Sequence, residues 1–261
     1  ALIHKMAKLA HSKYIQVIRK ITKKYQNTLC KINIMIGFVD YIKSCAKTAV
    51  LHNYVKPIIH DDSESYVDAT NLRHPIIEII NEQSEYVPHN IKIGKNNKGF
   101  NKGMLIYGLN SAGKSSLMKA VGLSIIMAQC GMYVPASSYI FSPYTSMYTR
   151  ITGYDNILQG LSSFALEMKE LRTIINRSTQ NALIIGDEIC NSTDYISGAA
   201  IVAATLVQLS DIGASFIFAS HLHNIVNIEK IKEMHNLKIC HITVGYDDKN
   251  DKLIFDRLLR D

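Results

Sequence analysis

Two glycines, Gly108 and Gly113, bracket four residues and are followed at once by Lys114 and Ser115. A loop with this spacing can turn its backbone N–H groups toward two phosphate groups. The apolar residues 104–107 predict a buried strand before the loop, and the residues after it predict a helix whose positive end faces the phosphates. The sequence therefore predicts a nucleotide-binding loop made of Gly108, Leu109, Asn110, Ser111, Ala112, Gly113, Lys114, Ser115 and Ser116.

Within this loop we expect Lys114 to reach the terminal phosphates and Ser115 to bind Mg2+. Hydrolysis also needs a carboxylate for the metal and a group that positions water, at the end of another buried strand. The apolar residues 182–186 predict such a strand, and Asp187 and Glu188 follow it. We expect Asp187 to hold the hydrated Mg2+ and Glu188 to polarise the attacking water, so the pair favours hydrolysis over binding alone.

A histidine follows a third predicted strand, at residues 215–219. His221 stands at its tip, where an imidazole can hydrogen-bond the γ-phosphate or the water and so report the nucleotide state. His223 is a weaker candidate for the same role. The predicted catalytic residues are therefore Glu188, His221 and Lys114.

The elements that position these residues alternate between short strands and helices from residue 66 onward, which predicts an α/β domain with a layered, largely parallel central sheet. Strands are expected near 91–94, 104–107, 146–151, 182–186 and 215–219, helices near 114–129, 162–177 and 195–210, and a terminal hairpin over 237–245 and 252–259.

The N-terminal part differs from this domain. Apolar residues recur at steps of three and four from Ile15 to Val39, which predicts one amphipathic helix over 13–51, on the order of 55–60 Å long. We expect Pro57 to end it and the polar run 61–65 to mark a boundary. The predicted domains are a helical lever or connector, 1–60, and a nucleotide-binding domain, 61–261.

The net charge of +7 is concentrated in the N-terminal segment. Residues 1–60 hold eleven Lys or Arg and one acid, Asp40, whereas the other 201 residues hold 18 basic and 21 acidic groups. This asymmetry indicates either a polyanion partner or the solvated face of a long helix, and the sequence leaves both open.

Other classes of protein fit the composition less well. A chain with 47% hydrophobic residues is typical of a folded globular protein, and five cysteines without close pairing indicate neither a disulfide framework nor a zinc site. The apolar stretch 199–209 is shorter than a membrane span, and no secretory signal is evident, so we expect an intracellular protein without a membrane partner. A start without Met suggests a piece of a longer chain.

Four segments, GLNSAGKSS, GLSSFALEM, ALIIGDEI and ASHLHN, with LRHPIIE upstream, resemble the ATPase domain of the MutS family of DNA mismatch-recognition proteins. The resemblance covers roughly residues 66–261, and residues 13–60 are similar to the base of the family's lever helix. Asn110 and the GLSSFALEM segment distinguish this family from transporter-type ATPases. The amino-acid sequence of these segments is similar to the organellar and giant-virus branch of the family, which implies an organellar or viral setting.

The resemblance implies a P-loop (ABC-type) ATPase fold that binds ATP and Mg2+ in composite sites of a homodimer. Ser162 matches the serine that reaches the γ-phosphate bound by the opposite subunit. Tyr86 and Val87 match the pair that packs on adenine, with a plain core role for Tyr86 as the alternative, and Arg257 or its neighbours are expected near the base. Residues 190–193 depart from the family's Gly-Arg-Gly-Thr loop, which puts the strength and symmetry of the dimer contacts in question.

The function implied by the resemblance is that of the ATPase domain of a mismatch-repair protein. ATP-driven dimer closure would pass through the lever helix to domains, absent from this sequence, that bind mismatched or damaged DNA. Two alternatives remain. A nucleotide-gated structural or dimerisation module is disfavoured by Asp187 and Glu188, and an ABC-type chromosome-maintenance or transporter ATPase is disfavoured by GLSSFALEM.

Overall fold

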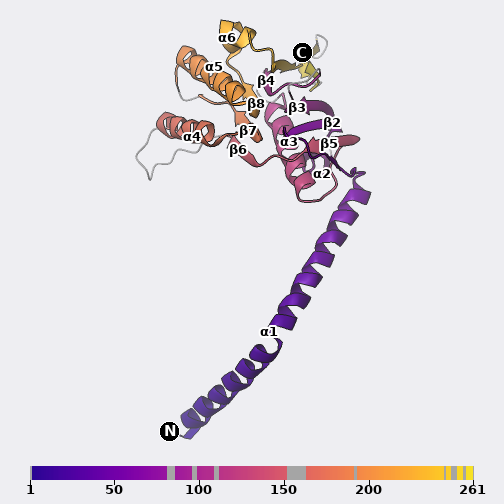
Figure 1. Cartoon of the computed structure of the whole chain (residues 1–261), viewed down its shortest axis with the longest axis vertical. Coiled ribbons are helices and arrows are strands. Elements are labelled where there is room, and N and C mark those ends of the chain that lie inside the picture. Colours follow the sequence, from indigo (N-terminus) through magenta and orange to yellow (C-terminus); the bar gives the residue numbers. More distant parts are fainter. Residues whose placement is uncertain are drawn as a thin grey trace. The chain divides into compact units, whose positions relative to one another are not determined.

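The chain divides into two compact units, Ala1–Leu51 and His52–Asp261, whose elements are labelled in Figure 1. The structure is a computed structural model. It describes residues 2–80, 86–95, 99–108, 112–151, 163–190, 193–243, 245–247, 252–254 and 257–260.

The first unit is one helix, α1 (Leu2–Leu51), of 50 residues, which corresponds to about 75 Å. It starts well before residue 13, because Leu2, Met6 and Leu9 continue the spacing of three and four residues. It ends before Pro57, two residues from Asn53, which has a left-handed φ of 52°. Asn tolerates this conformation better than most residues, and the conformation stops a right-handed helix.

The main sheet of the second unit has six strands. In spatial order they are β12 (Leu259–Arg260), β9 (Leu237–Ile242), β4 (Gly103–Tyr107), β8 (Ser215–Ser220), β7 (Ala182–Asp187) and β6 (Ser146–Ile151). All neighbours are parallel except β12, which runs antiparallel to β9. Every residue of β7 and β8 is buried, as expected for central strands covered on both faces.

A second, smaller sheet contains β1 (Ile58–Ile59), β5 (Ser138–Ser142), β2 (Tyr66–Leu72) and β3 (His89–Ile93), in that order. Strand β2 pairs antiparallel with both β3 and β5. Of these strands, the sequence pattern predicted only β3. Near the C-terminus, β10 (Gly245–Asp247) and β11 (Lys252–Ile254) form an antiparallel hairpin within the predicted terminal hairpin.

Helices cover both faces of the main sheet. The described helices of the second unit are α2 (Ile77–Ile80), α3 (Lys114–Gln129), α4 (Ser163–Arg177), α5 (Tyr195–Ile212) and α6 (Glu229–Lys232), with a 3-10 turn at His223–Asn227. Helix α3 lies in one core with residues of both sheets, while α4 and α5 form a second core on the other face (Figure 1). The predicted layered α/β fold is confirmed.

Helix α5 is long and apolar enough to cross a membrane by length and composition alone, with a mean hydropathy of 1.4 over 18 residues. The shorter stretch considered from the sequence did not meet that criterion. In α5, the side chains of Val202, Leu206 and Leu209 are buried in the same core as Phe216 and Phe218 of β8. Packing in this core accounts for the apolar character of the buried residues of α5, which make up 39% of the helix. The absence of a membrane partner stays a prediction.

Candidate nucleotide-binding and hydrolysis site

The register of the parallel strands brings three predicted segments to one edge of the main sheet. Tyr107, the last residue of β4, pairs with Ser220 of β8, and Ala219 pairs with Asp187 of β7. The phosphate loop follows Tyr107, and His221 follows Ser220. Ligands of open α/β sheets bind at this carboxyl edge of the strands, so the three segments face one common site.

The described part of the phosphate loop has the backbone that such a cradle requires. Gly108 has a φ of 144° and Gly113, the N-cap of α3, has a φ of 112°. Only glycine adopts these values readily. Nζ of Lys114 donates a hydrogen bond of 2.5 Å to the carbonyl of Gly108, so this side chain folds back across the loop. Leu109, Asn110 and Ser111 lie outside the described residues.

Lys114 is buried, and its ammonium group interacts electrostatically with both carboxylates of the Asp187–Glu188 pair. Burial lowers the pKa of Lys114, and the charges of Glu188 and Asp187 partly oppose that shift. Both carboxylates are therefore close enough to Lys114 to affect its charge, and the catalytic and metal-binding roles of the three residues stay a prediction. Ser115 and Ser116 are half-buried in the first turn of α3.

Asp187 ends β7 and is 6% exposed. Its Oδ1 atom is buried without a hydrogen-bond partner among the described residues, so this oxygen is available to bind a cation. The described residues contain no group of three or more His, Cys, Asp or Glu side chains able to hold a metal. The single carboxylate of Asp187 at the end of β7 is of the kind that binds Mg2+, which takes one or two protein groups together with phosphate oxygens and water.

Glu188 follows in a left-handed conformation, with φ of 48°, and its N–H donates a 3.0 Å hydrogen bond to the carbonyl of Ala219. The backbone bond joins the turn after β7 to the end of β8. Next to it, His221 has a ring atom, Nδ1, that is buried without a partner in the described part of the chain. A ring nitrogen in this state is available to a ligand. The side chain of His223 is outside the described residues.

A cavity of about 120 Å³ lies beside the phosphate loop. Tyr86, Val87 and Arg257, which the family resemblance placed near adenine, all line it. The sequence reasoning missed three further lining residues, Ile77, His89 and Ile242. For His89 a signal existed, because it follows Tyr86 by three residues, whereas Ile77 and Ile242 come from elements that only the fold brings together.

Two polar groups of this cavity are uncharged. Burial raises the pKa of the Tyr86 hydroxyl, with the positive charge of Arg257 opposing the shift, and that hydroxyl is buried without a hydrogen-bond partner among the described residues. Burial lowers the pKa of His89 to about 4, so its imidazole is neutral at pH 7. A flat aromatic ring beside neutral polar groups suits a nucleobase.

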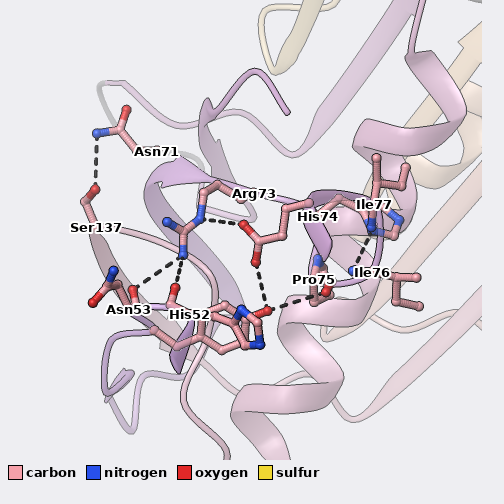
Figure 2. Close-up of polar contacts among 11 residues, drawn as sticks. His52, Asn53, Asn71, Arg73, His74, Pro75, Ile76, Ile77 and Ser137 are labelled. Atoms are coloured by element: carbon pink, nitrogen blue, oxygen red, sulfur yellow. Dashed lines mark hydrogen bonds and ion pairs between the residues drawn. The ribbon is translucent and has the colours of Figure 1, made fainter. Parts of the chain in front are cut away.

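One wall of the cavity is fixed by the contacts in Figure 2. Nδ1 of His74 accepts the N–H groups of both Ile76 and Ile77 at 3.2 Å (Figure 2), and the His74 ring lies 6.1 Å from that of Tyr86. Burial lowers the pKa of His74, which keeps Nδ1 free to accept. Nε of Arg73 forms an ion pair with Glu78 at 2.9 Å, which closes the segment 73–78 on itself.

The same network extends to the start of the unit (Figure 2). Tyr54 donates a 2.8 Å hydrogen bond to Glu78, and Nη2 of Arg73 donates to the carbonyl of His52 at 2.9 Å. The segment Arg73-His74-Pro75, singled out in the sequence, therefore positions Ile77 at the cavity. Ser162, the residue expected to serve the opposite subunit, lies outside the described residues.

A glycine-bounded loop between a parallel strand and a helix, with Asp and Glu at the end of another parallel strand two positions away in the same sheet, defines a P-loop nucleotide-binding domain. Residues 104–261 match the family described as MutS domain V, which is the ATPase domain of MutS proteins. The chain belongs to the MutS family.

Named relatives agree with this assignment. The chain is 40% identical, over 99% of its length, to a putative DNA mismatch repair protein mutS homolog of Acanthamoeba polyphaga mimivirus. It is 36% identical over 95% of its length to a mitochondrial mutS homolog of Sarcophyton glaucum, and 36% identical over 94% to MutS of Finegoldia magna. The chain spans 26%, 24% and 28% of these relatives, about a quarter of their length.

Proposed function

We propose that this chain binds ATP with Mg2+ and hydrolyses it. The observation that carries the proposal is the convergence of Lys114, Asp187, Glu188 and His221 at one sheet edge, set by the register of β4, β8 and β7. Lys114 and the loop N–H groups would bind the phosphates. Ser115 and Asp187 would hold Mg2+, which supplies positive charge against the phosphate oxygens when bound.

Glu188 would take the proton of the attacking water, and His221 would hydrogen-bond the γ-phosphate or that water. The base would occupy the cavity beside Tyr86, Val87 and Arg257. Two features support this placement: the cavity adjoins Gly113 and Ser116 of the phosphate loop, and two of its polar groups, the Tyr86 hydroxyl and the His89 imidazole, are neutral.

Comparison of ATP turnover by the unaltered chain and by Glu188→Gln tests the proposal. The Gln side chain keeps the size of Glu but cannot accept the proton, so we expect turnover to fall by about 100-fold or more with ATP binding retained. Glu229→Gln, on the exposed first turn of α6, is the matched control and should leave turnover unchanged. Equal rates for Glu188→Gln and the unaltered chain would refute the role of Glu188.

We further propose that the working form is a homodimer with composite ATP sites, because the family resemblance assigns Ser162 to the partner's γ-phosphate. ATP-dependent association of Glu188→Gln, followed by sedimentation, should be lost when Ser162→Ala is added. Association that survives this change would argue against the composite site. The substituted loop at residues 190–193 leads us to expect weak association.

The role of the full-length protein is a proposal of the same kind. The relatives are named for DNA mismatch repair, and we propose that ATP-driven closure acts on mismatched or damaged DNA through domains outside this chain. An intracellular setting, organellar or viral, is compatible with mitochondrial and viral relatives. A nucleotide-gated module without useful turnover is the second candidate, which phosphate-release kinetics would distinguish.

A further inference from the structure

Helix α4 carries a buried acid, Glu167, that takes no part in the site described above. The residue is only 6% exposed. Its Oε1 atom accepts the backbone N–H of Cys190 at 3.0 Å, across 23 residues of sequence. A guanidinium nitrogen of Arg150, on β6, lies 3.9 Å from the same oxygen. A buried carboxylate with these two partners is a fixed acceptor rather than a surface charge.

Cys190 belongs to the turn that begins with Glu188, and this turn has an unusual backbone. Glu188 and Cys190 both adopt left-handed φ values, 48° and 67°, although neither is glycine. Such conformations persist only where the surroundings hold them. Three contacts do so: the Glu188 N–H to the Ala219 carbonyl, the buried side chain of Ile189, and the Cys190 N–H to Glu167.

We propose that Glu167 is a positioning residue for ATP hydrolysis, because its carboxylate holds the Glu188–Cys190 turn in the backbone conformation that orients the Glu188 side chain. The inference rests on the proposed function, in which Glu188 acts on water. Glu167 itself acts through the backbone of Cys190 and has no assigned contact with nucleotide.

The hydrogen bond between Cys190 and Glu167 also connects the Glu188 turn to the part of the chain expected at the dimer interface. Glu167 lies one turn after Ser163, the first residue of α4, in the GLSSFALEM segment that also contains Ser162. One helix turn therefore separates the start of α4 from the hydrogen bond that holds the Glu188 turn, and Ser162 directly precedes that start in the sequence. A displacement of the start of α4 would reach Glu188 through this bond.

A matched control is present on the same helix. Glu170 pairs with Nε of Arg150 at 2.9 Å, as Glu167 approaches the same guanidinium, but it is 42% exposed and no described hydrogen bond joins it to the turn. A change at Glu170 removes its ion pair with Arg150 and leaves the hydrogen bond between Cys190 and Glu167 in place. Changes at Glu167 disturb the turn as well.

The test compares kcat, KM and the Kd for ATP among the unaltered chain, Glu167→Ala, Glu167→Gln and Glu170→Gln. We expect Glu167→Ala to lower kcat by about 10- to 100-fold, the range for a slightly misplaced catalytic group, with the Kd for ATP within about twofold. Glu167→Gln keeps an acceptor oxygen and should restore most of kcat. Glu170→Gln should behave as the unaltered chain.

Unchanged kcat in Glu167→Ala, or a loss in Glu167→Gln as large as that in Glu167→Ala, overturns the inference. If Glu167→Ala does not fold, Glu167→Asp replaces it, because the shorter side chain withdraws the carboxylate from Cys190; normal kcat there also overturns it. Adding Glu167→Ala to Glu188→Gln should cause no further loss. Failure of the proposed function is distinguishable, since Glu188→Gln alone would then turn over ATP normally.

Discussion

The positive charge of Lys114 offsets the negative charges of Asp187 and Glu188. Its ammonium group is buried, bonded to the Gly108 carbonyl, and coupled to Asp187 and Glu188. Without the lysine, two carboxylates at the end of β7 would repel the phosphates of a nucleotide. With it, the site offers a positive group for the phosphates and a carboxylate oxygen for Mg2+. The residues of this site are therefore interdependent, and each substitution changes the charge that its neighbours meet.

The buried imidazole of His89 makes stability depend on pH. Its pKa is about 4 in the folded chain and near 6.5 when unfolded, so the unfolded chain binds the extra proton first. Stability from the neutral form is complete above pH 6.5 and is lost as the pH falls toward 4. We expect urea denaturation to show a contribution of roughly 2–3 kcal/mol lost between pH 7 and pH 4.5.

His89→Asn should remove that part of the pH dependence, because Asn does not titrate. The control is His235→Asn, at an exposed position, which should preserve the pH profile of the unaltered chain. Parallel profiles for His89→Asn and the unaltered chain would show that burial of His89 does not set this dependence.

The residues that could be predicted from the sequence are those whose signal is local. Asp187 and His221 stand at the end of an apolar strand, and Lys114 follows such a strand across the glycine-bounded loop. Parallel strands must bring their carboxyl ends together. Glu167 and Ile242 could not be found in this way. Glu167 meets Cys190, and Ile242 meets the cavity beside the phosphate loop, only through the packing of elements that are distant in the sequence.

At the scale of elements the same distinction holds. The central strands β4, β7 and β8 are continuous apolar runs, which made them predictable. Strand β2 was missed because Asp68, Thr70 and Asn71 interrupt its apolar pattern. Its pairing with β3 and β5 depends on contacts across tens of residues, and a bulge between Ala69 and Leu72 breaks the alternation further.

Strand β7 approaches its neighbours too closely for a side chain at Gly186. A Cβ there would lie 2.7 Å from Cδ1 of Ile189 and 2.9 Å from Cε1 of Phe218, and both side chains are buried. We expect Gly186→Ala to lower the free energy of unfolding by about 1–3 kcal/mol in urea denaturation. It should also lower kcat, because Ile189 belongs to the turn of Glu188.

Gly37→Ala is the control for this substitution. Gly37 lies in α1 with nothing within 4 Å of its Cβ position, and alanine in a helix interior is favoured by roughly 0.5–1 kcal/mol. The change should not lower stability. A Gly186→Ala variant as stable as the unaltered chain would mean that Ile189 and Phe218 relax without cost.

At the scale of the whole molecule, the uneven charge is the property that the nucleotide site does not explain. Helix α1 exposes Lys20, Lys23 and Lys24 on a segment with few acids, whereas the second unit carries slightly more acids than bases. An exposed basic helix attracts a polyanion through release of its counterions, so that binding weakens as salt increases. We expect weak, salt-dependent binding of duplex DNA by the chain.

Changing Lys20, Lys23 and Lys24 to Glu should weaken this binding and flatten the plot of log affinity against log salt by about 2.7, the value for three lost phosphate contacts. Fluorescence anisotropy with a labelled duplex at several salt concentrations measures both quantities. The control reverses three exposed charges of the second unit, Arg172, Lys230 and Lys232, and so matches the change in net charge. If both triple variants weaken binding equally, net charge rather than α1 determines it. If neither does, the basic residues of α1 form the solvated face of a helix.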